Sequence, residues 1–272
     1  MTRIVGSVLL ALLVSALVLP GTAQEPEPEP KAEPKAEPKT DVPPPPTPEI
    51  VNALNQAFRD KHEPSAVAAL EQAVQAIKED ARAVREKAEL LKVMQVGLGN
   101  PNDRVKLVTV NALGRVGPEA AKPLSRALHL KPYEKNRELT QAVIEALGLT
   151  RDEKTALEDL VKIITAHPDW SVRALAARAL SNFDKNHASG QNRKKICEKM
   201  IQIYESIESA AADGRDSEAV RKRNAIREDF VSTLRALTEE EWNSGSDWRK
   251  WYNKAKRERW PDPPKKKEPG RS

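Results

Sequence analysis

Three stretches in the middle of the chain carry the same pattern of hydrophobic and polar positions. In each, a valine or leucine lies seven residues, about two helical turns, before an Ala-Leu pair. The leucines of these pairs, Leu113, Leu147 and Leu180, are 34 and 33 residues apart. The pattern therefore predicts a helix repeated with a period of about 34 residues. The stretches are DRVKLVTVNALGRVG (103–117), RELTQAVIEALGLTR (137–151) and WSVRALAARALSNFD (170–184).

A second predicted helix follows each of these stretches, so that every unit forms a helical hairpin. The second helices lie in PEAAKPLSRALHL, KTALEDLVKIITAH and RKKICEKMIQIYESI, and Gly117-Pro118 and His167-Pro168-Asp169 mark turns. Aromatic residues make up 4% of the chain and no alternating strand pattern occurs. One hairpin buries too little apolar surface to be stable alone, so the hairpins must stack. We expect an all-α fold, a right-handed α-solenoid over residues 49–260.

The edges of the array repeat the pattern less clearly. Residues 63–77 and 85–100 predict a degenerate first pair, and residues 48–60 predict a cap before it. Downstream, Ile226 and Leu234 repeat the same interval, but Leu234 lies 54 residues after Leu180. About 20 residues are therefore inserted into the last unit, and we place them in two loops. The loops are DKNHASGQN (184–192) and SAAADGRDSE (209–218).

These residues resemble a known family. Asp169-Trp170-Ser171-Val172-Arg173 and Asp103-Arg104-Val105-Lys106, each followed by its Ala-Leu pair, are similar to HEAT repeats. The similarity is greatest to the short HEAT-like type named after phycobilisome lyases, and it covers residues 64–237. In that family an Asp and an Arg form a ladder of ion pairs between repeats. The resemblance implies this role for Asp103, Lys106, Asp169 and Arg173, with an interruption at Thr140.

The aromatic end of the chain has two interpretations. A solenoid exposes apolar surface at each end and needs a cap with a polar outer face. Trp242, Trp248, Trp251 and Tyr252 can supply that cap, since Trp248 and Trp251 are neighbours on one helix face. The alternative is an aromatic patch that binds a ligand. The Asp-Trp-Arg-x-Trp-Tyr ending also looks like the terminal segment of exported bacterial HEAT-like proteins.

The beginning of the chain predicts export. Arg3 precedes an apolar run from Ile4 to Leu19, and the small-residue step Gly21-Thr22-Ala23 follows. This layout predicts a signal peptide over residues 1–23 and a periplasmic or secreted protein. The run of about 16 residues is short for a membrane-spanning helix, and an uncleaved inner-membrane anchor is the alternative. Residues 24–48 are rich in proline and predict a disordered, extended spacer or a strip for a proline-binding partner.

The charge is concentrated at the other end of the chain. From residue 249 to residue 272 there are ten Lys or Arg and three Asp or Glu, whereas the region between the spacer and this end is nearly neutral. The basic tail, residues 261–272, has no apolar face and is expected to be disordered. It is either a solvated charge run or an electrostatic tether for an anionic envelope polymer or a membrane surface.

Catalytic and cofactor motifs are absent from the sequence. His62, His129, His167 and His187 do not have metal-ligand spacing, and no phosphate-binding loop, GxSxG motif or specific nucleic-acid motif occurs. Cys197 falls on the apolar face of a helix and is expected in the core, with a reactive thiol as the alternative. We expect no cofactor, no metal and no enzyme activity.

These observations favour a non-enzymatic exported scaffold that binds a protein partner in the groove of the solenoid, lined mainly by the second helices. The electrostatic tether is the alternative, and a lyase-like enzyme or chaperone for a chromophore is the third hypothesis. The export signal counts against the third. The partner-binding candidates are Trp248, Trp251, Tyr252, Arg249, Lys250, Lys162 and Lys199.

Overall fold

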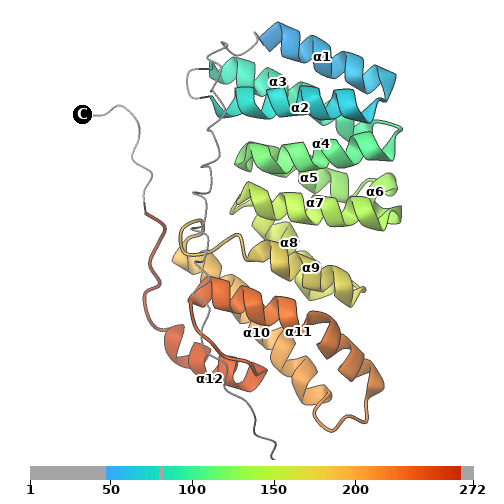
Figure 1. Cartoon of the computed structure of the whole chain (residues 1–272). Coiled ribbons are helices and arrows are strands. Elements are labelled where there is room, and N and C mark those ends of the chain that lie inside the picture. The colour runs from blue at the N-terminus through green and yellow to red at the C-terminus, as the bar shows by residue number, and fades with distance from the viewer. Residues whose placement is uncertain (1–46, 80–81, 265–272) are drawn as a thin grey trace, which may run out of the picture. The chain divides into compact units, whose positions relative to one another are not determined.

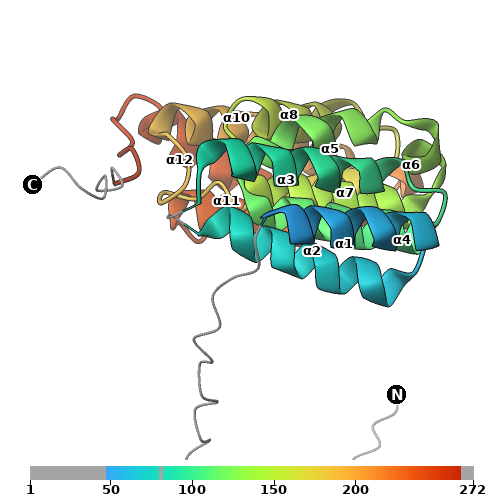
Figure 2. The same ribbon diagram turned by 90° about the horizontal axis from the view of Figure 1, so that it is seen from above.

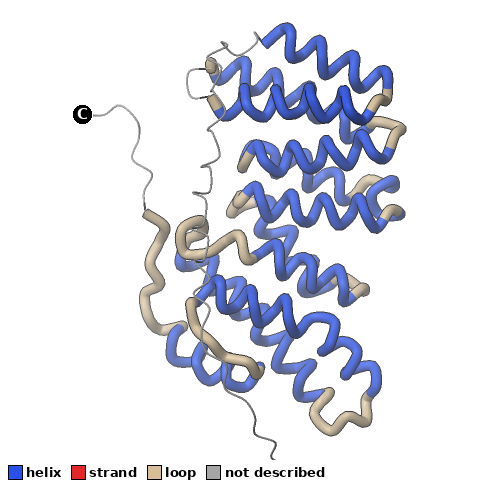
Figure 3. The backbone as a smooth tube through the Cα atoms, in the orientation of Figure 1, coloured by secondary structure: helices blue, strands red, loops and turns tan. Residues whose placement is uncertain are grey.

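The computed structural model describes residues 47–79 and 82–264. The predicted signal peptide, most of the spacer and the basic residues 265–272 lie outside the described residues. The part of the chain that is described is helical and contains no strand, and its helices pack with their neighbours in sequence order (Figure 3). The predicted all-α solenoid is therefore confirmed.

The described helices form two layers (Figures 1 and 2). The first layer contains α2 (Glu63–Lys78), α4 (Asp103–Val116), α7 (Arg137–Thr150), α9 (Trp170–Leu180) and α11 (Ser217–Thr238). The second layer contains α3 (Val84–Val96), α5 (Ala121–Leu128), α8 (Thr155–Ala166), α10 (Gly190–Ala210) and α12 (Gly245–Ala255). The remaining elements are α1 (Thr47–Asp60), which packs on α2 and α3, the short α6 (Lys131–Lys135), and the 3-10 turns η1 (Gly97–Gly99) and η2 (Pro118–Ala120).

Four of the first-layer helices begin in the same way. Asn102, Asn136, Asp169 and Asp216 precede α4, α7, α9 and α11, and each side chain accepts a hydrogen bond from the backbone N–H two residues later, at 2.8–3.0 Å. Such a cap satisfies one of the N–H groups that the first helical turn leaves without a partner. The caps therefore fix the start of these four helices.

The Ala-Leu pairs make the contact between successive first-layer helices. Leu113, Leu147 and Leu180 are completely buried. A Cβ placed on Gly114 would lie 2.9 Å from Cα of Ala146, and one on Gly148 would lie 2.7 Å from the carbonyl oxygen of Ala179. The backbones of α4, α7 and α9 therefore approach closely, and small residues make that approach feasible.

The inserted residues lengthen helices more than they form loops. The chain is outside α-helix only at residues 181–189 and 211–216 in this region, while α10 has 21 residues and α11 has 22, against 11 in α9. Apolar side chains of α10 are buried from Ile196 to Ile207, which supports the extra turns. Cys197 lies in this row and is completely buried, and burial raises the pKa of its thiol.

Candidate binding surfaces

The aromatic side chains near the C-terminus form a packed cluster on α10. Trp248 is completely buried and Tyr252 is 5% exposed. The rings of Trp248 and Trp251 meet edge to face with centroids 5.7 Å apart, and the Trp260 ring lies 5.8 Å from Trp251. Trp242, by contrast, is 38% exposed in the connection between α11 and α12. The cluster therefore caps the second layer, and it contains Trp260 rather than the predicted Trp242.

This burial corrects the assignment of Trp248 and Tyr252 as partner-binding residues. A side chain that is covered by its own protein has no surface to offer a partner. Trp251 is partly buried against the same core. Its indole shares the cap with Trp248 because residues three apart on a helix lie on one face. These aromatic residues hold the end of the stack together.

Arg193 fastens the segment after α12 to the body of the protein. This side chain is 4% exposed, and its guanidinium donates to the carbonyl oxygens of Leu237 at 3.1 Å and Pro261 at 2.5 Å. The backbone N–H of Gly190 donates to Oδ1 of Asp262 at 2.9 Å. A carboxylate is favourable at this helix N-terminus. Contacts with the body thus extend past Trp260, and the predicted tail boundary at residue 261 is too early.

The charged partner-binding candidates are dispersed. Arg249 Nε lies 2.8 Å from Glu205, Lys250 Nζ lies 3.3 Å from Asp247, and Lys162 Nζ lies 3.2 Å from Glu158. Lys199 is exposed on α10. Such surface ion pairs contribute roughly 0–1 kcal/mol each. The four candidates therefore lie on three different helices: Arg249 and Lys250 on α12, Lys162 on α8 and Lys199 on α10.

The expected ion-pair ladder takes a different form. Asp103 pairs with Lys106 of its own helix at 2.7 Å, and across the repeats it accepts only from the amide of Asn136 at 3.1 Å. These hydrogen bonds, that from Lys106 above all, lower the pKa of the Asp103 carboxyl. Asp169 caps α9, and the guanidinium of Arg173 stacks 3.9 Å from the Trp170 ring. Within residues 47–79 and 82–264 no ion pair therefore links these positions across repeats.

Ion pairs between repeats occur at other positions. Arg115 of α4 pairs with Glu71 of α2 at 2.5 Å, and Arg178 of α9 pairs with Asp229 of α11 at 2.8 Å. The pair with Asp229 raises the pKa of Arg178. The HEAT resemblance does not indicate these pairs, because Arg115 and Arg178 lie in the last turns of α4 and α9, at positions outside the matched motif.

A corner pocket lies where α5, α6, α7, α8 and α9 meet. Its volume is about 420 Å³. Aliphatic side chains line it together with four charged side chains, two acidic and two basic, and with two histidines that are distant in sequence. The lining residues are Leu128, His129, Glu134, Lys135, Arg137, Thr140, Ile144, Ile163, His167, Asp169 and Val172.

The corner pocket exists because α6 lengthens the connection between α5 and α7. Tyr133 of α6 is completely buried, and its hydroxyl donates to the carbonyl oxygen of Leu98 at 2.9 Å. Burial raises the pKa of this phenol. The Tyr133 carbonyl in turn accepts from the Thr140 hydroxyl at 2.6 Å. The wall that carries Glu134 and Lys135 is thus tied to both neighbouring repeats.

A second depression continues from the corner pocket toward α11. It has a volume of about 440 Å³ and shares Asp169 with the corner pocket. The Trp170 ring lies in it between two cations, with Arg173 at 3.9 Å and Lys222 Nζ at 5.6 Å from its centroid. Cation–π contacts of this kind hold the indole in place at the surface.

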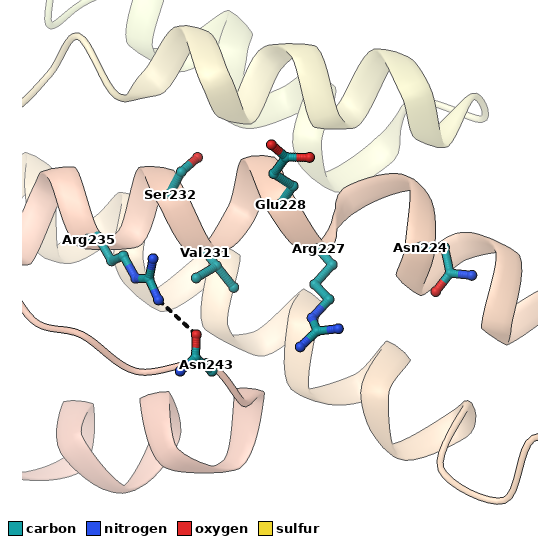
Figure 4. A pocket seen from close by; sticks show the side chains of 7 residues that line it. All are labelled: Asn224, Arg227, Glu228, Val231, Ser232, Arg235 and Asn243. Carbon is teal, nitrogen blue, oxygen red and sulfur yellow. Dashed lines mark hydrogen bonds between the residues drawn. The ribbon is translucent and has the colours of Figure 1, made fainter. Parts of the chain in front are cut away.

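The third depression lies on the side of α11 that faces away from α9 (Figure 4). We call it the α11 face; its volume is about 620 Å³. Figure 4 shows Arg227 and Val231 on the same side of α11 as Asn243, whose Oδ1 accepts from Arg235 at 2.7 Å. The lining residues are Asn224, Arg227, Glu228, Val231, Ser232, Arg235 and Asn243.

Among residues 47–79 and 82–264, no three His, Cys, Asp or Glu side chains cluster as metal ligands. In the same described segments, no helix combines the length and the apolar character that crossing a membrane requires.

Comparison with known proteins places a family match on the middle repeats. Residues 134–191 match a family model described as HEAT repeats. The match spans α7, α8 and α9 and includes most of the residues that line the corner pocket. No curated protein matches the chain. The match and the stacked helical hairpins together support a HEAT-repeat protein, and such repeats commonly mediate protein–protein interactions.

Proposed function

We propose, from the premise that residues 134–191 carry HEAT repeats, that the protein is a non-enzymatic exported scaffold that binds a protein partner at its corner pocket. The observation that carries the proposal is the pocket itself, which lies within the matched repeats and combines an aliphatic floor with a charged rim. This location replaces the second-helix groove that the sequence analysis favoured.

The corner pocket has the properties of a site for a peptide side chain. Its aliphatic residues bury apolar surface of a ligand, while a few polar groups fix orientation. Lys135 and Arg137 on its rim have no ion-pair partner among the described residues, so both are available to a partner's carboxylates. Leu130, next to the lining residues in sequence, is 45% exposed and extends the apolar surface.

Rigidity of the pocket wall supports the same proposal. Binding costs less free energy when the site is already in its bound conformation. The buried Tyr133 and its hydrogen bond to Leu98 hold α6 in position without a ligand. A partner that inserts one apolar side chain and pairs with Lys135 or Arg137 therefore does not lose binding free energy in ordering α6.

Site-specific photo-crosslinking tests the proposal. We expect a benzoylphenylalanine at position 135 to crosslink a defined envelope protein in intact cells, because this side chain points from the rim of the pocket. The matched control replaces Lys122, an exposed lysine of α5 that does not line the pocket. Adding Arg137→Glu to the position-135 variant should abolish the crosslink. Identical products at both positions, or no product at position 135, would contradict the corner pocket as the partner site.

Export is the second part of the proposal. The charge, apolar run and small-residue step at the beginning of the sequence support it. We expect N-terminal sequencing of the mature protein to begin at or near Gln24, in the periplasmic or secreted fraction. A membrane fraction that retains Met1 would instead favour an anchored protein.

A further inference from the structure

The α11 face is the surface on which a further repeat would pack. In the first layer α4, α7 and α9 each pack between their predecessor and their successor, and α9 occupies one side of α11. The next helix, α12, packs on α10 in the second layer instead. Among the described residues, no further first-layer helix therefore packs on α11, and the residues of the α11 face lie along this helix beside Asn243 of the connection to α12 (Figure 4).

Among the side chains of α11 that form no ion pair, positive charges outnumber negative ones. Glu218 pairs with Lys222 at 2.6 Å, and Asp229 pairs with Arg178 of α9. Glu228 is then the single remaining acidic side chain of this helix. Four arginines of α11 have no ion-pair partner within residues 47–79 and 82–264: Arg221, Arg223, Arg227 and Arg235.

Two of these arginines line the α11 face and are oriented there. Arg235 donates to Oδ1 of Asn243 at 2.7 Å. Tyr204 donates to the backbone carbonyl of Asn243 at 3.0 Å, which ties this connection to α10. Burial and the carboxylate of Glu208 raise the pKa of the Tyr204 phenol, and the nearby Arg227 guanidinium opposes that rise. Arg227 and Arg235 are eight residues apart, which is about 12 Å along the helix axis.

We propose that the α11 face binds an acidic, extended segment of a partner protein. Guanidinium groups bind carboxylates through paired hydrogen bonds. About 12 Å corresponds to roughly four residues of an extended peptide at about 3.1 Å each, so two carboxylates of one segment can reach both arginines. This inference does not depend on the corner pocket.

The remaining lining residues favour a peptide over a phosphate polymer. Asn224, Ser232 and Asn243 offer both hydrogen-bond donors and acceptors, which suit the N–H and C=O groups of a peptide backbone. Glu228 also accepts hydrogen bonds, which backbone N–H groups of a peptide can donate and an ionised phosphate chain cannot. Val231 supplies an apolar floor at the centre of the depression.

The test measures binding of a fluorescein-labelled hexaglutamate peptide to the mature protein by fluorescence anisotropy. We expect saturable binding at moderate salt that weakens at least about tenfold in the double variant R227Q/R235Q, because both carboxylate contacts are lost. Both side chains are exposed and lack ion pairs, and the hydrogen bond from Arg235 to Asn243 is at the surface, so the variant should melt within a few degrees of the parent. The double variant R227K/R235K should bind the peptide with intermediate affinity. Lysine keeps the positive charge but lacks the paired N–H donors with which a guanidinium binds a carboxylate.

The control variant K254Q/K256Q removes the same charge near the C-terminal end of α12 and should change the peptide affinity by less than about twofold. An equal loss of peptide affinity in R227Q/R235Q and K254Q/K256Q would overturn the inference. Absence of peptide binding by the parent protein would overturn it as well. Tighter binding of inorganic polyphosphate than of hexaglutamate at the α11 face would also overturn it, in favour of an anionic polymer. None of these outcomes bears on crosslinking at position 135, so failure of one proposal leaves the other testable.

Discussion

Replacing Trp248 with alanine should lower the free energy of unfolding by about 3–5 kcal/mol, the usual effect of truncating a buried aromatic side chain. Trp248 is completely buried between α12 and α10, and its ring packs on Trp251. Its removal leaves a cavity that the cap cannot fill without moving α12. Chemical denaturation followed by circular dichroism measures the change.

The matched control for this substitution is Trp242→Ala. Trp242 is 38% exposed and lies outside the aromatic cluster, so its truncation should change stability by less than about 1 kcal/mol. Trp251→Ala should fall between the two, because that ring is partly buried. Equal effects of the substitutions at Trp248 and Trp242 would contradict the assignment of the cap.

Replacing Gly148 with valine should destabilise the protein by about 3 kcal/mol, at the upper end of the usual cost of overpacking. The added Cβ would lie 2.7 Å from the Ala179 carbonyl oxygen and 3.0 Å from its Cα. These are backbone atoms, so a change of rotamer cannot relieve the contact, and α7 and α9 must separate. The same denaturation measurement applies.

The control for the glycine prediction is Gly99→Val. A Cβ on Gly99 meets no heavy atom within 4 Å, so this substitution should change stability by less than about 1 kcal/mol. If the two valine variants are equally stable, the close approach of α7 and α9 does not matter to the fold.

The repeat architecture could be predicted because local and global signals agree. The Ala-Leu pairs mark the buried contact between repeats, and Asn102, Asn136 and Asp169 mark where first-layer helices begin. Both signals depend on residues close in sequence. The period of about 34 residues then implies stacking, because an isolated hairpin cannot bury its apolar face.

The surfaces depend on contacts between distant residues and could not be predicted in the same way. Sequence spacing puts Trp248 and Trp251 on one helix face but does not show which of them points into the core. Asp262 contacts Gly190 across 72 residues, and no local pattern indicates that contact. The α11 face is open only because α12 packs on α10, which the aromatic content of α12 alone does not determine.

The corner pocket, too, could not be predicted from the spacing of residues in the sequence. His129 and His167 lie far apart in sequence and do not have metal-ligand spacing, yet both line one pocket. The signal available in the sequence was the long connection between α5 and α7, which contains Tyr133. A tyrosine in a connection can indicate that the connection is held against the core. The group that binds the Tyr133 hydroxyl, the Leu98 carbonyl, belongs to another repeat and cannot be identified from sequence spacing.

Native-state hydrogen exchange of the Trp248→Ala variant tests the central claim, that the described helices form a stack in which each hairpin depends on its neighbours and the aromatic cluster closes the end. Local opening free energies are read from exchange rates along the chain. The account predicts faster exchange in α10, α11 and α12, with α2 and α4 unchanged from the parent protein. A uniform increase across all of these helices, or no change in α10 to α12, would contradict it.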